Sequence, residues 1–393
     1  MKQKVLFLAV IFFTAVNAAN LTAQMTVSGV FDSSASMRGW APIGAGDEFN
    51  LAYGTEQFVN LRFQARMRER GRIIGAVNMF AAAGDPAVAA TIVNPNGVIQ
   101  GENYIAGIEL ERLHFRLDFD NVDLDGGLMR MPFGFGQVWG SSDFLNPPNP
   151  LRPDARPRAV LATSLSWFPG NDLRILGFGA AGRDPLTQDG SGWLAGLSMD
   201  QHWRRASFQM LYAFETPQDS SRFGIHRAGL SLKADLGIGF VIDALYTHNH
   251  ETYSRPTLDA LSASAGFDYS FFGGNLIFLA EYLFNGAASS TALGFGGNFV
   301  NEHYLYTGFT VRFNNFTNLN LAVISGLSDI SFTPVISLNH DIAQGVSLNL
   351  TTQIPLDRNS FFGDGNRGEL GPFPPGTNAG TYFTFNARLR FRF

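Results

Sequence analysis

The sequence predicts an all-β fold, an antiparallel up-and-down barrel of about eighteen strands, with about sixteen also compatible with the pattern. Three observations support this fold class. Apolar and polar residues alternate through many segments of the 393-residue chain, short turns alternate with long loops, and the chain ends in a strictly alternating strand. Successive side chains of a strand point to opposite faces, so each such segment has one apolar and one polar face.

The last strand shows the alternation most clearly. Residues 381–393 read TYFTFNARLRFRF, and the polar parity carries Arg388, Arg390 and Arg392. A terminal strand of alternating aromatics that ends in Phe resembles the closing strand of bacterial outer-membrane β-barrels. That resemblance implies a second role as the signal read by the barrel-assembly machinery, carried here by Phe383, Phe385, Leu389, Phe391 and Phe393.

The same period of two recurs upstream, most clearly in residues 57–67, 206–215, 225–235, 238–247 and 346–356. A tilted strand needs about nine to eleven residues to cross a bilayer, whereas strands of soluble sandwiches usually have about five or six. The lengths therefore favour a transmembrane barrel. A soluble all-β protein is the alternative, but its outer face would carry more charge.

Connections alternate between short and long, which sets the topology. In outer-membrane barrels short turns face the periplasm and long loops face outside, so both termini are expected on the periplasmic side. Short turns are predicted near residues 69–71, 120–121, 169–171, 201–202, 236–237, 272–274, 314–316 and 343–345, and loops near 38–54, 83–103, 134–158, 182–192, 216–222, 249–256, 285–301, 326–329 and 357–379.

The pattern of residues 1–24 predicts a secretory signal peptide. Residues 25–393 are predicted to form a single barrel domain. An N-terminal membrane anchor is the alternative, although the apolar stretch is short for a membrane-spanning helix. Cleavage after residue 18, 19 or 23 fits equally well. The features are a basic start at Lys2 and Lys4, an apolar stretch over residues 5–16, and small residues at Ala18, Ala19 and Ala23.

The composition excludes several classes of protein. Charged residues make up 16% of the chain, against about 25% in a typical soluble domain. There is no cysteine, so an exported chain of this kind needs another source of rigidity, which a closed hydrogen-bond ladder supplies. The net charge of −5 and the lack of a long basic run argue against a nucleic-acid partner.

A proline-rich segment, residues 127–158, interrupts the alternation. It follows a strand on the loop side, and its length suits a loop that folds inward and narrows a pore. We predict that residues 134–158 form this constriction; an external loop that packs only on itself is the alternative. The candidate constriction residues are Trp139, Asp143, Asn146, Arg152, Asp154 and Arg156.

Part of this segment resembles porin-like outer-membrane families that include the alginate-export channel. The matching pattern is Gln-x-Trp-Gly followed by Asp and Asn-Pro, although Arg130 is separated from Gln137 by six inserted residues, MPFGFG. The match covers under a tenth of the chain, so it implies a porin-like channel and no particular solute. The matching positions are Gln137, Trp139, Gly140, Asp143, Asn146 and Pro147.

The polar parity of the strands supplies candidate pore-lining charges. Ionisable side chains in such a wall must pair or face water, and a ring of arginines favours anions. Pairing across strands, which would only stiffen the wall, is the alternative. The candidates are Arg62, Arg66, Arg112, Arg130, Arg205, Arg227, Lys233, Asp243, Arg312, Arg388 and Arg390.

No motif indicates catalysis, a metal site or a cofactor. The histidines have neither a Gly-x-Ser-x-Gly nor a His-Glu-x-x-His context. The sequence therefore predicts a non-enzymatic channel in the outer membrane of a two-membrane bacterium. It would pass small hydrophilic solutes, contact outer-membrane lipid, and be a monomer or a homotrimer. A barrel transporter for hydrophobic compounds and an adhesive barrel with a closed lumen are the alternatives.

Overall fold

The computed structural model describes residues 25–40, 50–67, 70–84, 98–101, 103–146, 148, 150, 159–181, 192–217, 224–249, 256–286, 301–328, 330–354, 356 and 382–393. The predicted signal peptide and the candidate residues Arg152, Asp154 and Arg156 lie outside the described residues. No helix in the described part of the chain is both long and apolar enough to cross a membrane.

The strands follow one another along the chain, joined by turns and loops, with two short 3₁₀ helices, η1 (Leu258–Ala260) and η2 (Phe272–Gly274). The strands are β1 (Met25–Trp40), β2 (Asn50–Met67), β3 (Gly71–Gly84), β4 (Val98–Gln100), β5 (Tyr104–Phe119), β6 (Val122–Met129), β7 (Val160–Trp167), β8 (Leu173–Ala181), β9 (Trp193–Trp203), β10 (Ala206–Glu215), β11 (Ile225–Asp235), β12 (Gly239–Asn249), β13 (Leu261–Phe271), β14 (Leu276–Asn285), β15 (His303–Asn314), β16 (Thr317–Gly326), β17 (Ser331–Ala343), β18 (Val346–Gln353) and β19 (Tyr382–Arg392).

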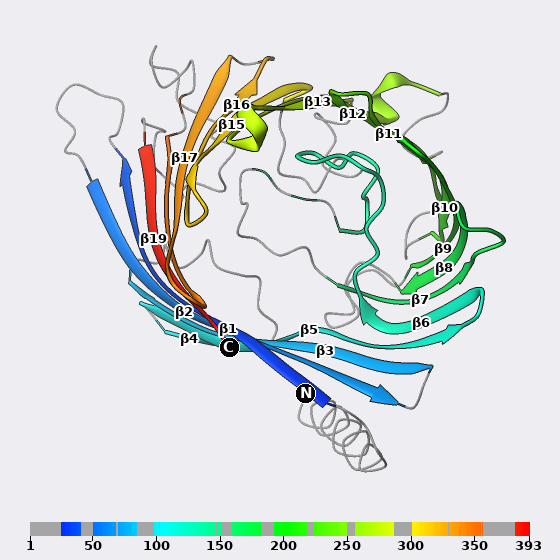
Figure 1. Cartoon of the computed structure of the whole chain (residues 1–393), viewed down its shortest axis with the longest axis horizontal. Helices are drawn as coiled ribbons and strands as arrows, with labels where there is room; N and C mark the ends of the chain where they lie inside the picture. Colours follow the sequence, from blue (N-terminus) through cyan, green and yellow to red (C-terminus); the bar gives the residue numbers. More distant parts are fainter. Residues whose placement is uncertain are drawn as a thin grey trace.

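These strands form one closed antiparallel barrel, as the sequence predicts (Figure 1). Each strand of the ring pairs with the next one along the chain, with β3 paired to β5 rather than to β4, and the last strand, β19, pairs with the first, from Val30–Arg392 to Trp40–Tyr382. The sheet has 19 strands, and all but the three-residue β4 belong to the closed ring, which leaves eighteen. Closure satisfies the backbone groups that an open sheet edge would expose.

β4 is an addition to the ring. It pairs with residues of β5 that also pair with β3, so it lies on the opposite edge of β5. β6 occupies that edge only farther along, from Leu113 to Phe119 of β5. β4 therefore continues the wall where β6 has ended.

The terminal Phe393 completes the seam beyond the last residue of β19. Gly29 and Phe393 exchange two backbone hydrogen bonds, of 2.7 and 3.1 Å between nitrogen and oxygen. A Cβ atom at Gly29 would lie 2.5 Å from the ring of Phe393. The absence of a side chain at Gly29 thus makes room for the terminal aromatic ring.

The short turns lie where the sequence places them, with one correction. The turn predicted at residues 201–202 lies at residues 204–205, because β9 continues to Trp203. Arg205, expected on a strand of the lumen wall, therefore lies in an exposed turn. The register explains this difference, since His202 pairs with Ser207 and Trp203 with Ala206.

The outer face of the wall is apolar and the inner face is polar. Two girdles of rings mark the ends of the outer face. The girdle on the turn side is rich in Phe and Trp and includes Phe119, Trp167, Trp203, Phe272, Phe313 and Phe316. The girdle on the loop side combines Tyr and His, with hydrogen bonds of 2.8 Å between Tyr212 and His226 and 2.6 Å between Tyr282 and His303. Such girdles are typical of the two interfaces of a bilayer.

Candidate functional site: the lumen and its internal segment

The chain leaves the wall after β6 and enters the barrel. Figure 1 shows this stretch, in cyan and teal, inside the ring of strands. We call residues 130–146 the internal segment. β6 and β7, which flank it, have 8 residues each, whereas β1 and β2 have 16 and 18. The wall is therefore short at the point where the chain turns inward.

Side chains of the wall hold the first part of the internal segment by its backbone. The amide of Gly134 donates to Oε1 of Gln209 on β10 at 2.6 Å. The amides of Phe135 and Gly136 donate to the carboxylate of Asp243 on β12, at 3.0 and 2.6 Å for the shortest contacts. Asp243 is completely buried, so these amides replace the water that a carboxylate otherwise requires.

Glu281 on β14 holds the next three residues in the same way. Its Oε2 accepts the amides of Gln137 and Val138, both at 3.0 Å, and its Oε1 accepts the amide of Trp139 at 3.1 Å. The indole Nε1 of Trp139 also donates to the backbone oxygen of Glu281, at 3.0 Å. Six consecutive backbone amides, from Gly134 to Trp139, thus bind wall side chains, and two of the three acceptor groups are carboxylates.

Apolar contacts support this clamp. Trp139 is fully buried and packs against Tyr304 of β15, with ring centroids 5.4 Å apart. Farther toward β6, Phe133 lies 5.0 Å from the ring of Phe178 and 5.7 Å from that of Phe144. The internal segment therefore has small hydrophobic cores of its own against the wall and is not held by polar contacts alone.

Glycines allow the close approach of the segment to these carboxylates. Gly134 and Gly140 have φ of 81° and 51°, in the left-handed region that favours glycine. A Cβ atom at Gly136 would lie 2.7 Å from the amide nitrogen of Gly140 and 2.8 Å from Oδ2 of Asp243. The glycines in the inserted MPFGFG therefore make the clamp possible.

Asp143 and Asn146 fix the end of the internal segment. Asp143 accepts the amide of Asn146 at 2.9 Å, and Oδ1 of Asn146 accepts the amide of Met131 at 2.8 Å, which closes the segment on itself. Burial raises the pKa of Asp143 from 3.8 to about 7, partly opposed by hydrogen bonds from the backbone. The negative charge of Asp243 contributes to the same rise.

Three of the candidate lumen arginines are paired with acids of the inner wall. Arg130 lies 3.0 Å from Glu111, and Arg390 lies 2.7 Å from Asp32, which joins the last strand to the first. The pair of Arg227 and Glu215, 2.7 Å apart, is almost completely buried. At least these three cations are thus compensated by acids of the wall.

The remaining candidates differ in their surroundings. Nε of Arg62 donates to Asn60 at 2.7 Å, and Arg388 lies on the inner parity of β19. Nε of Arg112 is buried without a hydrogen-bond partner among the described residues. Arg66, Lys233 and Arg312 also lie on inward-facing positions, toward the turn ends of β2, β11 and β15.

Sequence reasoning recognised Asp243 as a lumen residue but missed its bonding to the internal segment. Gln209, Asp32 and Asp200 were not singled out, although all three lie on inward-facing positions that the alternation marks. Asp200 accepts hydrogen bonds from Arg174 and Gln209, both at 2.6 Å. The available signal was a polar residue on the parity opposite the aromatics.

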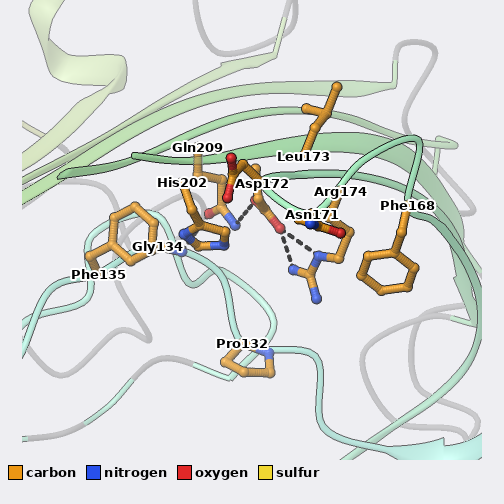
Figure 2. A pocket seen from close by; sticks show the side chains of 11 residues that line it. Pro132, Gly134, Phe135, Phe168, Asn171, Asp172, Leu173, Arg174, His202 and Gln209 are labelled. Atoms are coloured by element: carbon orange, nitrogen blue, oxygen red, sulfur yellow. Dashed lines mark hydrogen bonds and ion pairs between the residues drawn. The ribbon is translucent and has the colours of Figure 1, made fainter. Parts of the chain in front are cut away.

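A cavity of about 320 Å³ lies between the internal segment and the turn ends of β8 to β10. Figure 2 shows Pro132 and Phe135 of the segment on one side and Arg174, His202 and Gln209 of the wall on the other. Asp200 also lines the cavity and accepts the hydrogen bonds from Arg174 and Gln209. The described residues contain no group of three or more acidic or histidine side chains placed to hold a metal ion.

No protein-family model matches the sequence, and no curated protein matches it either. Solved structures of similar fold do exist. The structure of OccAB3 from Acinetobacter baumannii aligns with a TM-score of 0.55 and 11% identity over 93% of this chain and 99% of that one. A BenF-like porin from Pseudomonas fluorescens Pf-5 aligns with a TM-score of 0.57 and 9% identity, over 94% and 98% of the two chains.

OccK2 (OpdF) from Pseudomonas aeruginosa, solved in complex with glucuronate, aligns with a TM-score of 0.56 and 10% identity over 94% of this chain and 98% of that one. At such low identity the similarity shows the fold alone, and it agrees with the closed eighteen-strand barrel. The narrower resemblance of residues 137–147 to families that include the alginate-export channel stays a prediction.

Proposed function

We propose that the chain is a porin-like channel of an outer membrane, through which small hydrophilic solutes diffuse. The observation that carries this proposal is the division of the barrel into an apolar outer face and a polar inner face, with one segment clamped inside it. An apolar outer wall with girdles at both ends suits lipid, and a polar inner wall suits water. The fold shared with the Occ proteins and the BenF-like porin supports the same function.

The internal segment is the constriction of the proposed channel. Its hydrogen bonds go to Gln209, Asp243 and Glu281, so it is fixed along the inner face of β10 to β14. A segment held against one side of the wall narrows the lumen there. This arrangement favours a channel over an adhesive barrel with a closed lumen or a barrel that carries hydrophobic compounds.

Single-channel recording in a planar bilayer tests the proposal. The purified, refolded protein should open discrete ohmic conductance steps in potassium chloride. A barrel that is folded, as judged by its mobility on a gel before and after boiling, but never conducts would overturn the channel function. Boiled protein is the control for leaks caused by detergent.

The arginines of the inner wall lead us to propose a weak preference for anions. Arg112 is one such residue, since it lies on an inward-facing position of β5, opposite Ala76 of β3. The reversal potential under a salt gradient measures this preference, and Arg112→Gln should shift it toward cations. Arg70→Gln is the matched control, because Arg70 lies in an exposed turn with its side chain 59% accessible. A clear cation preference of the unaltered protein would contradict the proposal.

The remaining features of the proposal concern export and assembly. Residues 1–24 would direct secretion, and the aromatic parity of β19 would be read by the barrel-assembly machinery. The exposed ring of Phe393 and its place at the seam support the second role. Removal of Phe393 should lower the amount of folded barrel in the outer membrane, and unchanged amounts would refute this role. Monomer and homotrimer both remain compatible with the apolar outer face.

A further inference from the structure

The inner wall beyond the clamp, from the strand next to β14 onward, carries an uncharged polar surface. It runs from β15 across β16 to β19 and reaches β1, and its side chains are amides and hydroxyls. We call it the amide patch. Its members are Thr310, Asn318, Asn320, Ser337, Asn339, Asn349, Thr351, Asn386 and Ser36.

Strand register aligns these residues in two neighbouring rows across the wall. One row is Asn318–Asn339–Asn349, and it continues to Arg388 on β19. The other is Thr310–Asn320–Ser337–Thr351–Asn386–Ser36, without a charged residue. Neighbouring strands lie about 4.8 Å apart and successive inward residues about 7 Å apart, so the longer row spans about 24 Å.

Hydrogen bonds between members hold the polar groups in place. Asn339 donates to Asn318 at 3.0 Å, and Thr351 donates to Asn349 at 3.0 Å. Thr310 donates to Asn320 at 2.8 Å, and Asn386 donates to Ser36 at 2.8 Å. Ser337 and Thr351 share a further hydrogen bond of 2.9 Å. All these side chains are half-buried, so they are fixed by neighbours on one side and open to the lumen on the other.

The network leaves hydrogen-bonding capacity unused. Nδ2 of Asn318 donates to no described residue, while its Oδ1 accepts two hydrogen bonds. Oδ1 of Asn386 also accepts none among the described residues, but this atom is buried in the wall. The patch therefore offers the amide donor of Asn318 beside half-buried hydroxyl and amide oxygens that have further lone pairs, and their orientation costs little further entropy because the network already holds them.

This chemistry differs from that of the wall from β1 to β6. There the inward positions pair acids with bases, as in the contacts of Arg72 with Asp118 and Arg116 with Asp125, both 2.7 Å. Amides and hydroxyls carry no net charge, and they exchange hydrogen bonds with any ligand that both donates and accepts. A neutral molecule with many hydroxyl groups, each a donor and an acceptor, fits such a surface.

From these two neighbouring rows of amides and hydroxyls we propose that the amide patch is a binding site for neutral polyhydroxylated solutes, namely sugars or polyols, on their path through the channel. The proposal rests on the channel function and adds a class of solute to it. The two aligned rows provide successive equivalent contacts, so a sugar exchanges one set of hydrogen bonds for the next as it moves. Such binding is weak and reversible.

Maltose is the probe, and its effect on single-channel current is the measurement. Binding gives a block of current that saturates with maltose concentration, whereas added viscosity alone lowers the current steadily without saturation. Asn339→Ala and the nearly isosteric Thr351→Val should each weaken the apparent maltose affinity about five-fold, the value for one lost hydrogen bond. Lys233→Gln, on β11 outside the patch, is the matched control and should leave that affinity unchanged.

The outcomes separate this inference from the channel function. A saturable block weakened by Asn339→Ala or Thr351→Val, and unaltered by Lys233→Gln, supports the site. A conducting channel with only the viscosity effect overturns it. If the barrel does not conduct, the channel function fails, and titration calorimetry of maltose into the protein in detergent decides the site by itself. Binding heat that is present with the unaltered protein and lost in Asn339→Ala would support the site. The absence of binding heat with the unaltered protein would refute it.

Discussion

The carboxylate of Glu281 allows a sharp test of the clamp. In Glu281→Gln one carboxylate oxygen becomes an amide nitrogen, which cannot accept the amide hydrogens of residues 137–139. The remaining side-chain oxygen still accepts two hydrogen bonds. The third is lost, and the unsatisfied backbone amide costs about 1–3 kcal/mol of free energy. The two retained bonds lose the assistance of charge, at about 0.5–1 kcal/mol each. The clamp should therefore weaken by about 3 kcal/mol.

Hydrogen exchange of the peptide that contains residues 134–146 measures this change. A loss of about 3 kcal/mol corresponds to exchange of these amides up to about 150-fold faster. Single-channel current should also become noisier as the internal segment moves. Glu302→Gln is the matched control, because Glu302 is 55% exposed and its carboxylate contacts His303 rather than the segment. Unchanged exchange in Glu281→Gln would show that the carboxylate does not hold the segment.

Three further predictions concern charge and backbone. Asp143 has a pKa of about 7 in the folded segment against 3.8 in the unfolded one, so the folded segment keeps a proton that the unfolded one releases. The stability of the segment should therefore fall by roughly 3 kcal/mol as the pH rises from 4 to 7, and Asp143→Asn should remove this slope in Trp139 fluorescence. Arg227→Ala breaks a buried ion pair and should cost about 3–5 kcal/mol in unfolding by denaturant, whereas Arg70→Ala should change it by less than about 1 kcal/mol. Gly134→Ala combines a positive φ with a Cβ atom 2.6 Å from Asp243, so it should raise hydrogen exchange in the segment; normal exchange would contradict the clamp geometry.

The sequence predicts the barrel well because period-two alternation is local. Each strand shows its lipid and lumen faces by parity alone, as in Phe391 against Arg390, and the physical requirement for closure gives the rest. Partners are less accessible, because they depend on register between strands. Arg390 pairs with Asp32, which is 358 positions away, and a shift of one residue would have turned either side chain to lipid.

The clamp was beyond sequence reasoning for another reason. Its donors are backbone amides, which every residue has, so no side-chain pattern marks them. The prolines of residues 127–158 indicated that the alternation breaks there, and they could not show which wall the segment approaches. The misplaced turn at residues 201–202 has a similar cause, since two more polar residues extend β9 without breaking its alternation.

β4 has a consequence for how the barrel meets lipid. When β6 leaves the wall, the edge of β5 near Gly107 would face hydrocarbon with bare amide and carbonyl groups, each costing several kcal/mol there. β4 pairs with residues 105–107 of β5, so it satisfies the backbone groups that are left without a partner where the chain turns inward after β6. Without this repair the barrel would have a window in its side, through which lipid or solute could enter laterally. The inward turn of the chain after β6 thus depends on the presence of β4 at the edge of β5.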